Sequence, residues 1–170
     1  MHENEASSIL KSLVGVLKQE AAIYEELLAM SKDKTHVIVK GKIQELEQIV
    51  KSEQDYILKL SELENERETF VDRLSAIKGT KAEELTISAI TQMFAGKEAE
   101  ELFIVQQKLM ETIQSLSETN ELNEKLIQSS LDYINFTISL ITTAGDDDNS
   151  YDTNASLKAP KSKSLLDMKI

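Results

Sequence analysis

Two asparagines, Asn120 and Asn123, are the polar residues whose spacing points most directly to a specific chemistry. They lie in a stretch that reads Thr-Asn-Glu-Leu-Asn-Glu-Lys-Leu-Ile, so on a helix they share one face. An amide side chain both donates and accepts hydrogen bonds. The pair supports two hypotheses, and both stay open. Either the amides set the register of a helical bundle, or they bind the backbone of a partner segment lying along the helix.

The remaining polar residues do not form a pattern typical of catalysis or metal binding. Of the two histidines, His2 lies at the N-terminus, and His36 lies near the end of an expected helix, where the helix dipole favours a cation. The sequence contains no Glu-x-x-His pair, zinc motif or phosphate-binding loop. Three adjacent carboxylates at Asp146–Asp148 make a poor cation cage. We therefore predict no enzyme activity, no catalytic residues, no metal and no cofactor.

Helices must position these residues, because the composition leaves little room for a sheet. Five glycines and one proline in 170 residues are too few for the turns that an all-β or α/β fold needs. Apolar residues at three- and four-residue steps predict an all-α fold. We expect an antiparallel coiled-coil-like bundle of three long helices plus one short helix. The long helices span about residues 6–39, 42–78 and 97–143, and the short one spans about residues 81–95.

Three local details of these helices are further predictions. Thr80 to Glu83 has the form of a capping box, which would start the short helix. Glu53 and Arg67 interrupt the apolar seam of the second helix. Either their stems cover apolar surface, or they form paired polar contacts that fix register. Gly145 and the acidic run after it should end the last helix, since acidic residues are unfavourable there.

The chain changes in composition after residue 144. Residues 1–144 are expected to form the helical bundle. Residues 145–170 are mostly small, polar or charged and contain the one proline, Pro160. We expect these residues to form a flexible, disordered C-terminal tail.

The last long helix is apolar around most of its circumference near its C-terminal end. From Leu126 to Ala144 only Asp132 carries a charge. A surface helix normally has one apolar stripe, so another surface must cover this segment. Uncovered apolar surface of this kind usually marks a site that binds another protein. The candidate binding residues are Asn120, Asn123, Leu126, Ile127, Leu131, Ile134 and Ile138.

Charge and composition limit the location and the partners. A net charge of −11 argues against binding nucleic acid or an anionic membrane surface. The absence of cysteine fits a reducing compartment. No signal peptide or continuous apolar run of about 18 residues is present, so we expect no membrane insertion. The sequence predicts a cytoplasmic protein that is a monomer or a weak homodimer.

The same residues resemble a known family. The pattern Thr119-Asn120-x-x-Asn123-x-x-Leu126-Ile127 resembles the Leu-Asn-x-x-Asn-x-x-Leu-Leu signature of FlgN-type flagellar export chaperones, with Thr119 in place of the usual leucine. The segment Val37–Leu46, with its glycine at Gly41, is similar to that family's junction between the first two helices. The resemblance covers roughly residues 6–143.

The resemblance implies a function. Such chaperones hold the hook–filament junction proteins FlgK and FlgL by binding their amphipathic C-terminal segments, and they deliver them to the flagellar type III export gate. A tyrosine just beyond the last helix is implicated in docking to the gate protein FlhA, and Tyr151 matches it here. Two alternatives stay open: a coiled-coil scaffold or adaptor without a client, and a chaperone of another type III secretion system.

Overall fold

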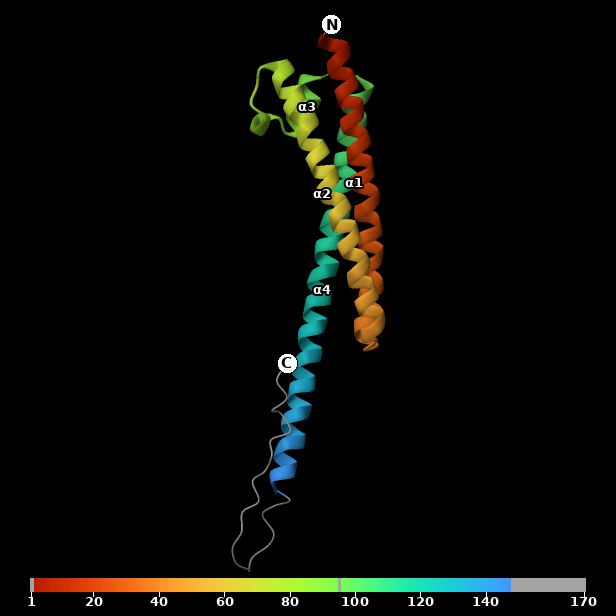
Figure 1. Cartoon of the computed structure of the whole chain (residues 1–170), viewed down its shortest axis with the longest axis vertical. Helices are drawn as coiled ribbons and strands as arrows, with labels where there is room; N and C mark the ends of the chain where they lie inside the picture. Colours follow the sequence, from red (N-terminus) through yellow and green to blue (C-terminus); the bar gives the residue numbers. More distant parts are fainter. Residues whose placement is uncertain (1, 95, 148–170) are drawn as a thin grey trace, which may run out of the picture. The chain divides into compact units, whose positions relative to one another are not determined.

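The computed structural model describes residues 2–94 and 96–147, with side chains described between residues 4 and 143 (Figure 1). All regular structure in these ranges is helical, which confirms the predicted all-α fold of long helices with a short helical segment between them. The elements are α1 (His2–Val39), α2 (Ile43–Lys78), the 3-10 turn η1 (Ala82–Glu84), α3 (Ile87–Met93) and α4 (Lys97–Asp147). The chain divides into a first unit, residues 1–130, and a second unit from residue 131 onward.

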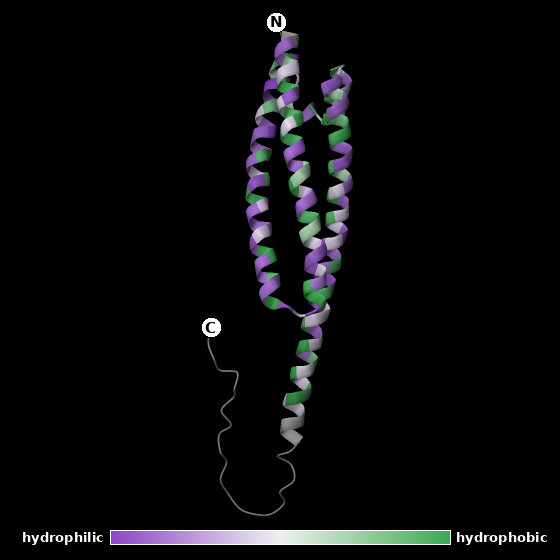
Figure 2. Ribbon diagram, turned by 90° about the vertical axis from the view of Figure 1, so that its right-hand side faces the viewer, coloured by the Kyte–Doolittle hydropathy of each residue, from purple (hydrophilic) through white to green (hydrophobic). Residues whose placement is uncertain are grey.

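The chain reverses direction between α1 and α2 within three residues. Gly41 has a φ of 65°, in the left-handed region that glycine adopts without a steric cost. The Gly41 N–H donates to the Ile38 carbonyl at 3.0 Å, and the Lys42 N–H donates to the Val37 carbonyl at 3.1 Å. These bonds satisfy carbonyls at the end of α1. As a result α1 and α2 run antiparallel and side by side, as Figures 1 and 2 show.

The segment after α2 differs from the prediction. Gly79, with a φ of 69°, ends α2 as expected. The single helix predicted over residues 81–95 is instead η1 followed by the seven-residue α3. The capping box does not form, since Thr80 Oγ1 is buried without a hydrogen-bond partner among the described residues. The helix start is at Thr86, whose hydroxyl accepts from the Ala89 N–H at 3.1 Å, so a different hydroxyl caps a shorter helix.

The core of the first unit lies where four helices converge. Leu13 and Leu17 of α1 share one buried cluster with Leu74 of α2, Ile90 of α3 and Leu102 of α4. These five side chains are at most 1% exposed. Burying each contributes about 1.5–3 kcal/mol. This cluster fixes the first part of α4 against α1.

The two charged residues that interrupt the α2 seam pair with α1. Glu53 Oε1 lies 2.6 Å from Lys34 Nζ, and both side chains are largely buried. Arg67 Nε lies 3.6 Å from Glu20 Oε1. Burial raises the pKa of Glu20 above its usual range, and the Arg67 charge acts in the opposite direction. These contacts support the hypothesis that paired polar groups fix the register of α2 against α1.

α4 continues past its predicted end. The sequence predicts a helix end near residue 143, yet α4 includes Gly145 and ends at Asp147. A single glycine costs a helix only about 1 kcal/mol, which does not stop a helix of 51 residues. The rest of the predicted tail, residues 148–170, lies outside the described residues.

Candidate protein-binding site

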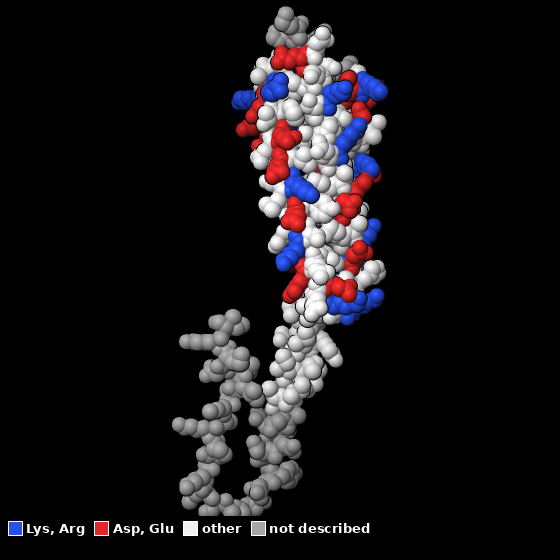
Figure 3. Space-filling view, turned by 45° about the vertical axis from the view of Figure 1, so that its right-hand side comes forward, with Lys and Arg blue, Asp and Glu red and all other residues white. Residues whose placement is uncertain are grey.

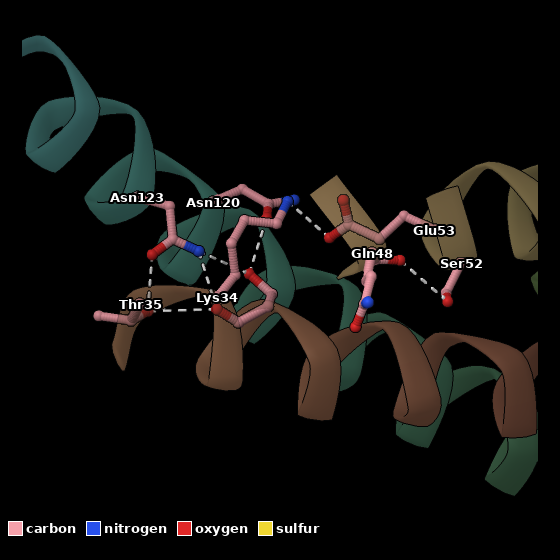
Figure 4. Close-up of polar contacts among 8 residues, drawn as sticks. Lys34, Thr35, Gln48, Ser52, Glu53, Asn120 and Asn123 are labelled. Atoms are coloured by element: carbon pink, nitrogen blue, oxygen red, sulfur yellow. Dashed lines mark hydrogen bonds and ion pairs between the residues drawn. The ribbon is translucent and has the colours of Figure 1, made fainter. Parts of the chain in front are cut away.

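Asn123 is buried where α4 meets α1 (Figure 4). Its side chain is 3% exposed. The amide Nδ2 donates to the Ser31 carbonyl at 2.8 Å and to Ser31 Oγ at 3.2 Å. The amide Oδ1 accepts from Thr35 Oγ1 at 2.6 Å. The amide of Asn123 is therefore hydrogen-bonded at both ends within the chain.

Asn120 lies on the same side of α4 but at the surface. Its Oδ1 accepts a hydrogen bond from Ser31 Oγ at 2.7 Å, while Ser31 itself is fully buried. One serine thus contacts both predicted asparagines. These intramolecular bonds support the register hypothesis, because they connect fixed positions of α1 and α4. A role of Asn120 and Asn123 toward a partner stays a prediction.

A groove opens beside this polar cluster between α2 and α4. It has a volume of about 710 Å³ and lies entirely within the first unit. Its apolar lining comes from three helices: Tyr24 and Leu27 of α1, Ile57 and Leu60 of α2, and Leu116 and Ile127 of α4. Of the predicted site residues, Asn120, Asn123 and Ile127 line it.

Sequence reasoning missed the α1 and α2 residues of the groove. Leu60 lies on the apolar seam of α2, and a residue on that seam is expected to be buried in the core of the bundle and not to line a groove. Ile57 and Leu58 are both apolar and both lie off that seam, yet only Ile57 lines the groove, so the sequence contains no signal that separates them. In the structure the Ile57 side chain is 58% exposed.

The other predicted positions lie on or near the exposed end of α4. Leu126, in the first unit, is half-buried. In the second unit, Leu131, Ile134 and Ile138 are 48%, 50% and 51% exposed. Figure 3 shows charged side chains over the first unit and none in view on this part of α4. The predicted apolar surface is therefore open to solvent in the free chain.

The opposite side of this helix segment is apolar as well. Tyr133, Phe136 and Leu140 are also exposed. Helical spacing places them roughly half a turn away from Ile134 and Ile138. The end of α4 thus has two apolar faces, one aliphatic and one rich in aromatic rings. This agrees with the prediction that the segment is apolar around most of its circumference.

Metal-ligand clusters and membrane-spanning helices are both missing from the described residues. No group of three or more acidic or histidine residues in the described part of the chain is placed to hold a metal ion. Within the same ranges no helix combines the length and the apolar character needed to cross a bilayer.

An all-helical chain with an exposed apolar helix end has the features of a protein that binds other proteins. Comparison with known sequences identifies the family: the model described as "FlgN protein" matches residues 1–159. The chain therefore belongs to the FlgN family of flagellar export chaperones. It is 31% identical over 157 residues to "Uncharacterized protein YvyG" of Bacillus subtilis (strain 168), covering 91% of this chain and 94% of that protein. No solved structure matches the chain.

Proposed function

We propose that this chain binds the amphipathic C-terminal segments of FlgK and FlgL in the cytoplasm, prevents their premature assembly and delivers them to the export gate. The observation that carries the proposal is the exposed apolar surface of α4 at Leu131, Ile134 and Ile138. Membership of the FlgN family supports a chaperone role in flagellum assembly. The active form is a monomer or a weak homodimer.

Binding at this surface has a simple physical basis. A client helix that packs on α4 removes apolar surface of both chains from water, and each fully buried Leu or Ile contributes about 1.5–3 kcal/mol. Because this part of α4 is already helical, the ordering cost falls mainly on the client. A client whose apolar face is covered in this way cannot use that face for assembly. Asn120, Asn123, Leu126 and Ile127, which belong to the first unit, are the other residues proposed to contact the client.

The proposal is tested by calorimetric titration of the chain with FlgK and FlgL from the same bacterium. Each client is compared with a variant that lacks its C-terminal segment. We expect saturable binding only when the segment is present, because the apolar stripe of the segment supplies the contact. Equal binding of the shortened clients, or no binding of either full client, would contradict the proposal.

Delivery to the export gate is assigned to Tyr151, which lies outside the described residues. Tyr151→Ala should leave the affinity for FlgK and FlgL unchanged, while copurification with FlhA and the amount of exported FlgK both fall. Asp152→Ala, the adjacent substitution, is the control and should change neither measurement. Normal export in the Tyr151→Ala strain would remove this residue from the docking step.

A further inference from the structure

The groove between α2 and α4 has the dimensions of a helix-binding site. On α4 its lining runs from Leu116 to Gln128, and on α2 from Glu53 to Glu64. At 1.5 Å per residue each wall is about 17 Å long, which corresponds to about three helical turns. Leu27 of α1 is buried and forms part of the floor.

Each of the two walls carries an exposed isoleucine. Ile57 on α2 is 58% exposed, and Ile127 on α4 is 38% exposed. Both line the groove, so a helix lying between the walls would cover both side chains and the apolar floor at once. The neighbouring Leu58 is also exposed, but it is not part of the lining.

The charged lining residues determine which kind of helix fits. Lys34 and Glu53 pair with each other, which leaves Glu64 on the α2 wall and Glu124 on the α4 wall. Glu64 pairs with Arg67, but carboxylates still outnumber cationic groups among the lining residues and Arg67 together. Burial raises the pKa of Tyr24, a lining residue, and the charges of Glu20 and Glu64 raise it further against the effect of Arg67. On the α4 wall Glu124 lies one helical turn before Ile127, and on the α2 wall Glu64 lies two turns after Ile57.

We propose that this groove binds a basic amphipathic helix of about three turns. Its apolar stripe packs on Ile57, Leu60 and Ile127, and its Lys or Arg side chains flank the stripe and face Glu64 and Glu124. The bound helix adds a fourth long helix to the first unit, in the manner of helix-in-groove recognition. The inference rests on the proposed function in taking this helix to be a client segment.

The test uses two synthetic helical peptides of about five turns with the same leucine stripe. One carries lysine on its polar face, and the other carries glutamate at the same positions. Binding to the full chain is measured by fluorescence anisotropy at several salt concentrations. We expect the lysine peptide to bind at least about tenfold more tightly, with a difference that shrinks as salt increases. Equal affinity of the two peptides would overturn the proposal.

Substitutions locate the site, each with a matched control. Ile57→Asp should weaken lysine-peptide binding by at least about tenfold, and Leu58→Asp should not. Glu124→Lys should weaken it as well, and Glu111→Lys, the same charge change on the opposite side of α4, should have a small effect. Equal losses in target and control variants would mean non-specific attraction to an acidic protein and would overturn the proposal.

A second copy of the chain is the competing occupant, and light scattering detects it. A dimer that Ile57→Asp dissociates, with peptide binding unaffected, would assign the groove to self-association and overturn the proposal. The peptides contain no client sequence, so the result is independent of whether FlgK and FlgL are the clients. Binding of the lysine peptide without binding of FlgK would reject the proposed function but not the groove as a helix-binding site. Binding of FlgK without binding of the lysine peptide would reject the groove as a helix-binding site but not the proposed function.

Discussion

Ile134→Asp is expected to abolish binding of the FlgK and FlgL C-terminal segments and to leave the helix content of the free chain nearly unchanged. Ile134 is 50% exposed, so its replacement removes little buried surface from the free protein. In the complex the same position would place a carboxylate in an apolar contact, which costs several kcal/mol unless the charge is paired. The measurements are calorimetry with the client segments and far-UV circular dichroism.

Ile104→Asp is the matched control for this substitution. Ile104 is on the same helix, is 66% exposed and does not line the groove of the first unit. It should leave both client affinity and helix content unchanged. An Ile134→Asp variant that unfolds would show that the position belongs to a core. Equal affinity in the two variants would remove the end of α4 from the binding surface.

Asn123→Asp is expected to destabilise the chain by about 2–4 kcal/mol at neutral pH. The Asn123 Nδ2 group donates to the Ser31 carbonyl at 2.8 Å, and a carboxylate there would place two acceptors against each other in a buried site. Protonation restores a donor, so the folded state raises the pKa of the new carboxyl above its unfolded value of about 3.9. The free energy of unfolding of this variant should therefore rise toward that of the unsubstituted chain as pH falls through the raised pKa. It should fall again as pH rises. Urea unfolding at several pH values measures this.

Asn120→Asp provides the comparison within the same cluster. Asn120 Oδ1 only accepts, from Ser31 Oγ, and a carboxylate accepts equally well. Because Asn120 is at the surface, this variant should lose less than about 1 kcal/mol. Equal stability losses in the two variants would contradict the polar cluster as a register-fixing contact.

The helices could be predicted because their signals are local. Apolar residues at three- and four-residue steps, together with glycines that reverse or end a helix at Gly41 and Gly79, placed α1, α2 and the start of α4 to within a few residues. The segment after Gly79 was harder, since Thr80 and Thr86 both qualify as helix caps and tertiary packing decides between them. Gly145 was also misleading, because the small cost of one glycine in a helix is not enough to end α4.

The candidate site was predictable in part. The exposed end of α4 follows from the near absence of charge after Leu126, which a sequence displays directly. The hydrogen-bond partners of Asn123 cannot be predicted from the local sequence, because Ser31 and Thr35 lie 92 and 88 residues away along the chain. The groove required the same long-range information, since three helices must be placed before Ile57 and Ile127 are known to line one groove.

The exposed apolar faces at the end of α4 have a consequence for colloidal behaviour. A surface made to bind an apolar helix also attracts other copies of itself, unless a longer-ranged repulsion keeps the copies apart. The net charge of −11 supplies that repulsion over a Debye length of about 8 Å at physiological ionic strength. Concentrated salt shortens its range, and acidification toward the isoelectric point near 4.7 removes the charge. We therefore expect the chain to self-associate through this helix end in concentrated salt or at a pH near the isoelectric point.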